Sequence, residues 1–346
     1  MTEADYCCRL RWSVAAVAAG LLLLAPTACG GNESADTGGP RPEQQLRGAG
    51  TLTQVSPLTG EVARDGLPDH PVLAVKIDNT AGSSPQLGLD SADMIAEELV
   101  EGGLTRLAVF FYSQVPSEVG PVRSMRASDI GILKPVNATL VASGGAPPAV
   151  RRLAGADVAT ITQTTRGADG YVRDSSRTVP YDLMLRLGEL VKSLPAADAA
   201  TVPSPYLPFG PEDDFPGGEP ATSIDATFSP AHTTRWEYDR GTGYVRPDSL
   251  AQPGHDFVAD NVLVLRVKVG NAGYRDSAGS PVPETIFEGT GSALLFHAGE
   301  VAAGTWRKDG LGAGVELQAK NGDALTVPAG HTWIELVPVD SGSVAY

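Results

Sequence analysis

The sequence predicts an α+β protein, with an N-terminal mixed α/β layer domain at 55–195 and a β-rich C-terminal domain at 224–346. Three observations favour this class. The chain has 346 residues, more than one hydrophobic core usually organises. Strand and helix patterns alternate before residue 195, whereas short strands and tight turns follow residue 224. Hydrophobic residues make up 42% and charged residues 19%, which is typical of a folded chain.

The first 28 residues form a predicted signal peptide. Two arginines precede an apolar run at 14–25, which has the length of a signal-peptide core and is too short to span a bilayer as a helix. The run leads to Ala28-Cys29, which resembles the bacterial lipobox, although Pro26 stands where leucine is usual. We therefore expect cleavage before Cys29 and acylation of its thiol, which would anchor the protein to a membrane. The alternative is an ordinary secretory peptide with Cys29 as an incidental thiol.

Residues 29–54 form a predicted flexible tether, because they are rich in Gly, Pro, Ser, Asp and Gln and contain almost no large apolar side chain. The three cysteines of the chain, Cys7, Cys8 and Cys29, all lie within its first 29 residues. The body that follows therefore has no disulfide, no thiolate nucleophile and no cysteine metal site.

The N-terminal domain is predicted from strand signals that alternate with helix signals. Buried strands are expected at 72–77, 107–112 and 139–143. Asp90 is positioned to cap a helix over 91–100, whose apolar residues fall on one face before Gly102 and Gly103 end it. Further helices are expected at 126–133 and near 149–153.

Residues 196–223 form a predicted inter-domain linker, because prolines, glycines and four acids crowd into the stretch 203–220. Beyond it, strands are expected at 235–238, 243–245, 262–269, 293–296, 301–306, 315–318 and 332–337. An Asn-Gly pair at 321–322 is a hairpin signal. Trp306 and Trp333 lie inside apolar strand patterns and are expected in the core rather than on a sugar-binding platform.

Several stretches together resemble the YerB-like bacterial lipoproteins, a family without an established biochemical activity. They are PLTG at 57–60, VKIDN at 75–79, PQLGLDSADMIAEELVEGGLTRLAVFF at 85–111, GPVRSMR at 120–126, GTW at 304–306 and HTWIELVP at 331–338. A looser match at 171–183 has Tyr181-Asp182 where His-Asn is expected in relatives. The resemblance implies a two-part α+β protein anchored outside the cell membrane, and it implies no reaction.

The charge is unevenly distributed between the two domains. The net charge of the whole chain is −15, which argues against nucleic acid as a partner. Residues 196–346 carry 9 basic and 20 acidic side chains, whereas residues 55–195 carry 13 basic and 16 acidic ones. The basic side chains, most of them arginines, are therefore concentrated in the N-terminal domain.

Arginines near the ends of predicted elements are the candidate anion-binding residues. Arg106 opens a strand, and Arg123 and Arg126 flank a loop that leads into a helix, with Ser124 as a further donor. Guanidinium groups bind phosphate or carboxylate with paired hydrogen bonds, and ligands are often held at element ends of an α/β layer. The full candidate set is Asn79, Arg106, Arg123, Ser124, Arg126, Arg173 and Arg177. The alternative is that neighbouring carboxylates pair with these arginines and only fix loops.

Two function classes fit these residues. The first is a lipoprotein on the outer face of the cytoplasmic membrane that binds an anionic wall or lipid component, or a protein partner, without a cofactor. The second is a LytR-like phosphotransferase or hydrolase acting on a polyprenyl-linked wall substrate, with Asp78 and Asp93 holding magnesium beside the arginines. The sequence contains no G-x-S-x-G, H-x-x-x-H or Walker motif. The binder is favoured because no nucleophile and base form a recognisable pair.

Overall fold

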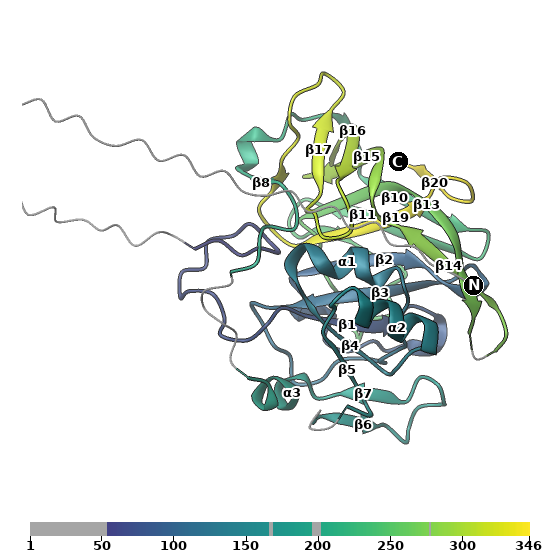
Figure 1. Ribbon diagram of the computed structural model, residues 1–346. Helices are drawn as coiled ribbons and strands as arrows, with labels where there is room; N and C mark the ends of the chain where they lie inside the picture. The colour runs from purple at the N-terminus through teal and green to yellow at the C-terminus, as the bar shows by residue number, and fades with distance from the viewer. Residues whose placement is uncertain (1–53, 166–168, 196–201, 277) are drawn as a thin grey trace, which may run out of the picture. The chain divides into compact units, whose positions relative to one another are not determined.

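The computed structural model describes residues 54–165, 169–195, 202–276 and 278–346 (Figure 1). The predicted signal peptide at 1–28, the acylation site Cys29 and all but the last residue of the predicted tether lie outside these residues. Strands dominate the described chain and short helices accompany them, which confirms the α+β class. No helix in the described ranges is long and apolar enough to cross a bilayer.

One 12-stranded sheet contains strands from both halves of the chain. Its main order is β17-β16-β15-β13-β19-β2-β3-β1-β4-β5, while β14 pairs with β13 and β9 with β16. The strands from the N-terminal half are β1 (Leu73–Asp78), β2 (Met94–Leu99), β3 (Thr105–Phe111), β4 (Thr139–Ala142) and β5 (Thr160–Thr162). Those that follow are β9 (Glu219–Pro220), β13 (Asn261–Arg275), β14 (Pro281–Ile286), β15 (Gly289–His297), β16 (Glu300–Lys308), β17 (Glu316–Ala319) and β19 (Thr332–Pro338).

The two halves of the chain join in the middle of this sheet. β19 pairs in parallel with β2, so that Thr332 lies opposite Met94 and Leu336 opposite Glu98. On its other side β19 pairs in parallel with β13. The described residues accordingly form one compact unit, and the sheet continues across the predicted boundary at 196–223.

The prediction of a helix over 91–100 is wrong, because β2 occupies most of this stretch as a central strand. The pattern misled because Glu97 and Glu98 look like the solvent-facing side of a helix. Both side chains are instead completely buried, where Glu97 accepts a hydrogen bond from Asn79 and Glu98 forms an ion pair with Lys76. Internal polar partners thus allow a buried strand to carry two acids.

The described residues include three short α-helices, α1 (Asp129–Leu133), α2 (Pro147–Gly155) and α3 (Leu187–Ser193). α1 begins three residues later than the helix predicted at 126–133, so that Arg126 lies in the preceding loop. α2 contains the helix predicted near 149–153. The 3₁₀ turns are η1 (Ala81–Ser83), η2 (Leu89–Ser91), η3 (Glu101–Gly103), η4 (Lys134–Val136) and η5 (Glu212–Asp214).

Hydrophobic cores lie on both faces of the sheet, because successive side chains of a strand point to opposite faces. α1 and α2 cover the face that includes Ala74 and Phe110 (Figure 1). α3 and a four-stranded sheet of order β12-β11-β10-β20 pack on the face that includes Val75 and Val109. The remaining strands are β6 (Tyr171–Arg173), β7 (Leu183–Leu185), β8 (Phe209–Gly210), β10 (Ser223–Ser229), β11 (His232–Asp239), β12 (Gly243–Val245), β18 (Val327–Pro328) and β20 (Ser343–Ala345).

Trp306 and Trp333 are buried, as predicted from their strand patterns. Trp333 packs edge to face against Trp236, with ring centroids 5.1 Å apart. The described part of the predicted linker is also structured, since β8 pairs with β18 and β9 with β16. All four acids of the stretch 203–220, those of η5 and Glu219, are exposed.

Candidate functional site

The end of β1 and the start of β3 bring an aspartate beside an arginine. The two strands are antiparallel, and Asp78 lies opposite Arg106. The loop after β3 returns to the same edge of the sheet, where the amide of Arg123 donates to a backbone carbonyl of β1 at 2.8 Å. This loop therefore places Arg123, Ser124 and Arg126 beside Arg106.

Arg106 is the most unusual member of this group. It is only 6% exposed, and its Nη1 makes a long hydrogen bond of 3.4 Å to the carbonyl oxygen of Ser124. Within the described residues, its Nε has no hydrogen-bond partner and its guanidinium forms no salt bridge. Burial, together with the positive charges of Arg126 and Arg123, lowers the pKa of Arg106 to about 10. The side chain therefore stays positively charged at neutral pH.

Arg126 is held by a carboxylate. Its Nε and Nη2 donate to the two carboxylate oxygens of Glu101, each at 2.7 Å. Burial lowers the pKa of Arg126, but the hydrogen bonds and charge of Glu101 outweigh burial and raise it. Its Nη1 donates to the carbonyl of Ser124 at 3.2 Å, which is also the acceptor for Arg106. The two guanidinium groups therefore share one acceptor.

Arg123 is the third arginine of the group and lies beside Asp78. Its Nε lies 3.0 Å from Oδ2 of Asp78, and its Nη1 donates to the carbonyl of Pro180 at 2.7 Å. Its guanidinium carbon lies 5.5 Å from the ring centroid of Tyr181, within the range of a cation–π contact. Asp78 is fixed in turn by the amide and hydroxyl of Thr80. Arg123 is thus oriented before any ligand binds.

The three arginines line a single cavity of about 220 Å³. Its walls also include Asp78, Glu101, Thr105, Tyr181 and Asp276. This volume has room for an anion the size of phosphate with a few water molecules. Arg123 and Arg126 each face a carboxylate, whereas Arg106 contributes a positive charge without such a partner among the described residues.

Three of the predicted site residues lie elsewhere. Asn79 points away from the arginines and donates to Glu97 and Thr105, each at 2.9 Å. Arg173 is exposed and pairs with the buried carboxylate of Asp182. Arg177 pairs with Asp174 and donates to the carbonyl oxygens of Ser83 and Pro85. The two arginines therefore fix loops, as the structural alternative predicted, and they do not reach the cavity.

The magnesium alternative requires Asp78 and Asp93 to meet beside the arginines. β1 and β2 both run antiparallel to β3, and Asp93 precedes β2 whereas Asp78 ends β1, so the two acids lie at opposite ends of the sheet. The carboxylate of Asp93 instead accepts hydrogen bonds from the amides of Tyr112 and Ser113. The described residues also contain no group of three His, Cys, Asp or Glu side chains suited to a metal ion.

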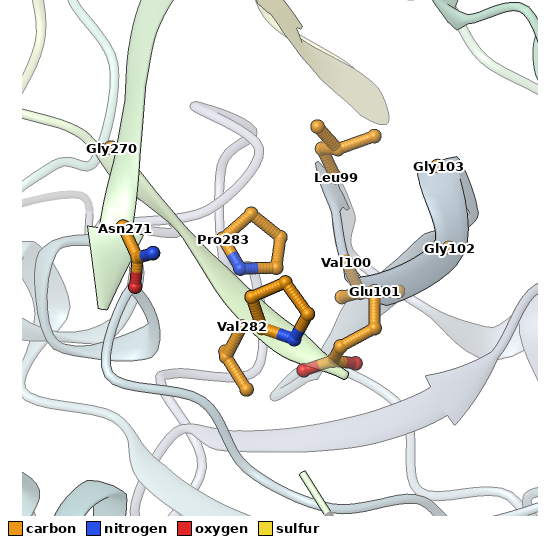
Figure 2. Close-up of a pocket in the computed structure, with 10 residues that line it drawn as sticks. Leu99, Val100, Glu101, Gly102, Gly103, Gly270, Asn271, Val282 and Pro283 are labelled. Atoms are coloured by element: carbon orange, nitrogen blue, oxygen red, sulfur yellow. The ribbon is translucent and has the colours of Figure 1, made fainter. Parts of the chain in front are cut away.

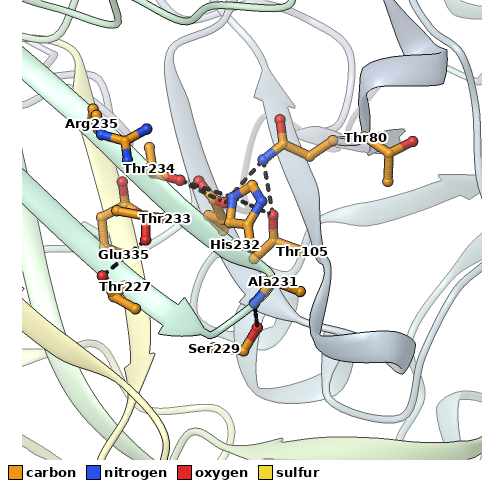
Figure 3. Close-up of polar contacts among 12 residues, drawn as sticks. Thr80, Thr105, Thr227, Ser229, Ala231, His232, Thr233, Thr234, Arg235 and Glu335 are labelled. Carbon is orange, nitrogen blue, oxygen red and sulfur yellow. Dashed lines mark hydrogen bonds and ion pairs between the residues drawn. The ribbon is translucent and has the colours of Figure 1, made fainter.

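A buried polar cluster next to the cavity was not predicted (Figure 3). His232 of β11 places its Nε2 2.8 Å from Glu97, and Trp236 donates to Glu335 at 2.8 Å. Burial would raise the pKa of Glu97, but the hydrogen bond and charge of His232 lower it to about 2. Burial raises the pKa of Glu335 well above its usual value, and the charge of Glu97, its neighbour across the strands, raises it further.

Sequence reasoning also missed two wall residues of the arginine cavity. Tyr181 was noted only as a departure from relatives, although aromatic rings commonly accompany arginine. Asp276 follows the long strand β13 and belongs to the other half of the sequence. No local pattern could have assigned it to this cavity, because its position depends on the pairing of β19 with β2.

Another cavity, of about 300 Å³, lies between η3 and the β13–β14 hairpin (Figure 2). Its walls are mostly glycine, proline, valine and leucine. Glu101 lines it as well, but both carboxylate oxygens of Glu101 are engaged by Arg126. This cavity therefore offers little for specific binding.

The fold and the site define a β-rich α+β protein with an arginine-lined, anion-sized cavity at one edge of a continuous sheet. Comparison with known families identifies the class more closely. The chain belongs to the family described as protein of unknown function DUF3048, whose N-terminal domain matches residues 58–200 and whose C-terminal domain matches residues 224–334.

Two comparisons with Bacillus subtilis confirm the resemblance seen in the sequence. The chain is 24% identical over 304 residues to the protein of strain 168 named "Putative lipoprotein YerB", covering 84% of this chain and 88% of that protein. The crystal structure of YerB protein from the same species matches with a TM-score of 0.68 at 23% identity, covering 85% of this chain and 100% of that one. The structural match supports the fold.

Proposed function

We propose that this protein binds an anionic ligand of the cell envelope through Arg106, Arg123 and Arg126, without catalysing a reaction. The observation that carries the proposal is Arg106, a buried guanidinium group that forms no salt bridge among the described residues and lines a cavity. Leaving such a group unpaired is costly, and a bound anion would remove that cost. Phosphate is the ligand chemistry that best fits guanidinium groups in a small cavity.

Calorimetric titration of inorganic phosphate into the full-length protein and into Arg106→Met tests this proposal. A hydrogen bond to a charged group contributes about 1.5–3 kcal/mol, so the substitution should weaken binding roughly 10- to 100-fold. The matched control is Arg186→Gln, which removes one exposed arginine that is paired with Glu189 outside the cavity. The control should bind phosphate like the wild type.

Equal affinity in the wild type and in Arg106→Met would overturn the proposal. We further propose that binding requires no metal, since Asp93 lies at the far end of the sheet from Asp78. The chelator EDTA should therefore leave the titration unchanged. A phosphate affinity that disappears with EDTA and returns with magnesium would instead favour the LytR-like alternative.

We propose that the protein is a lipoprotein held at the outer face of the cytoplasmic membrane by acylated Cys29. The apolar run at 14–25 and the small residues before Cys29 support this location. The name of the Bacillus subtilis relative, a putative lipoprotein, supports the lipid attachment. A membrane-bound receptor for an anionic envelope component, or for a protein partner that carries one, is consistent with both the anchor and the cavity.

A further inference from the structure

A larger cavity adjoins the arginine cavity. The second cavity has a volume of about 520 Å³ and shares Ser124, Arg126 and Asp276 with the first. Ser124 marks the junction, because its carbonyl oxygen accepts from both Arg106 and Arg126 while its hydroxyl lies 3.2 Å from the hydroxyl of Ser143 in the larger cavity. A ligand that occupied both cavities would therefore lie against Ser124.

The larger cavity offers uncharged hydrogen-bonding groups. Besides the two serine hydroxyls it contains Gln163, whose Nε2 donates to the carbonyl of Ser143 at 3.0 Å. The space next to Gly144 is unfilled, since an added Cβ there would meet no atom within 4 Å. At Gly145 an added Cβ would collide with Met125 at 2.5 Å, so this position excludes a side chain.

Each charged group of the larger cavity has at least one hydrogen-bond partner within the protein. Arg126 is bound by Glu101, and Arg275 donates to the carbonyl of Gly279. The carboxylate of Asp276 accepts from two backbone amides, those of Ala278 and Ser280, through one oxygen. The surface that remains suits a neutral group with several hydroxyls rather than a second phosphate.

We infer that the ligand is a phosphate monoester of a hydroxyl-rich, sugar-like group, with the phosphoryl group at Arg106 and the hydroxyls in the cavity lined by Ser143 and Gln163. This inference rests on the proposed function, since it uses the same anion site. It adds the chemistry of the group that is esterified to the phosphate. This group must form hydrogen bonds to the serine and glutamine side chains of the larger cavity, because burying those side chains without partners costs free energy.

Four probes titrated into the full-length protein test the inference: inorganic phosphate, glucose 1-phosphate, phenyl phosphate and glucose. Glucose 1-phosphate should bind at least about 10-fold more tightly than phosphate or phenyl phosphate, the equivalent of one or two added hydrogen bonds. Ala146→Leu, which fills part of the larger cavity, should abolish this advantage and leave phosphate binding unchanged. The matched control is Ala154→Leu, an exposed position on α2, the helix that begins directly after Ala146.

The inference and the proposed function fail in different ways. Phenyl phosphate binding as tightly as glucose 1-phosphate would overturn the inference, because it would show that the larger cavity prefers apolar groups. An unchanged preference in Ala146→Leu would overturn it as well. In both cases phosphate would still bind in an Arg106-dependent manner. Failure of phosphate to bind the wild type would instead contradict the proposed function itself.

Discussion

At the scale of single residues, Arg106 is costly for the folded state and is the central residue of the proposed anion site. Its burial and its two arginine neighbours oppose its charge, and no carboxylate pairs with it in the described ranges. A buried arginine retained only for stability would instead be paired with a carboxylate. Functional sites commonly reduce stability in this way.

Replacing Arg106 with methionine should therefore stabilise the ligand-free protein. We expect the free energy of unfolding to rise by about 1–3 kcal/mol, the usual cost of a buried polar group left unpaired. Denaturant unfolding in phosphate-free buffer measures this change. Arg126→Met is the matched comparison and should lower stability by about 3 kcal/mol, because it leaves Glu101 without its partner. A large loss of stability in Arg106→Met would indicate a structural role.

The buried acid pair of Glu97 and Glu335 should give stability a distinct dependence on pH. The folded state raises the pKa of Glu335 above its usual 4.5, so its contribution is present below that value and is lost as pH rises through the folded pKa. The pKa of Glu97 is lowered in the folded state to about 2, so its contribution to stability is fully present above about 4.5. This contribution is lost as the pH falls from about 4.5 to about 2.

Glu335→Gln should remove the first effect, because glutamine stays neutral. Its stability relative to the wild type should increase as pH rises from 5 to 8, measured by urea unfolding at several pH values. Trp236 retains an oxygen acceptor in this variant. A constant difference between the two proteins across this range would contradict the raised pKa.

The candidate site was partly predictable at this scale. Strand and loop patterns placed Arg106, Arg123 and Arg126 at element ends, and the structure brings all three into one cavity. The same reasoning could not separate them from Arg173, because the sequence of a polar turn does not show whether its arginine lines a cavity or pairs with a carboxylate elsewhere. Only the tertiary contacts distinguish the two cases.

At the scale of elements, β2 shows most clearly which strands local sequence patterns fail to predict. Strands 72–77, 107–112 and 139–143 were predicted because their residues are apolar on both faces. β2 was not, since its two acids imitate an amphipathic helix and their partners come from distant segments, Lys76 for Glu98 and His232 for Glu97. Such pairing cannot be found from local periodicity.

The pairing of β2 with β19 should make the two halves of the chain unfold together. We expect one calorimetric transition for the full-length protein and no cooperative transition for the isolated fragment 55–195. The fragment lacks β19 and would expose the edge of β2, a strand buried on both faces. Two separate transitions, or a fragment that melts cooperatively, would show that the halves are independent domains.

At the scale of the whole molecule, the anchor and the cavity belong to different parts of the chain. The anchor is predicted in residues that precede the described structure, so it can be tested separately from the fold. Cys29→Ala should move the protein from the membrane fraction to the soluble fraction and abolish labelling with a fatty-acid analogue. A variant that still sediments with membranes, together with an unlabelled wild type, would contradict the lipoprotein proposal.

The most direct test of the central claim is a crystal structure of the protein soaked with phosphate. We predict density for one phosphate within hydrogen-bond distance of the Arg106 guanidinium group, in the cavity shared with Arg123 and Arg126. The phosphate should be absent from crystals of Arg106→Met soaked in the same way. An empty cavity in the wild type, with phosphate bound only at surface arginines such as Arg173, would contradict the account.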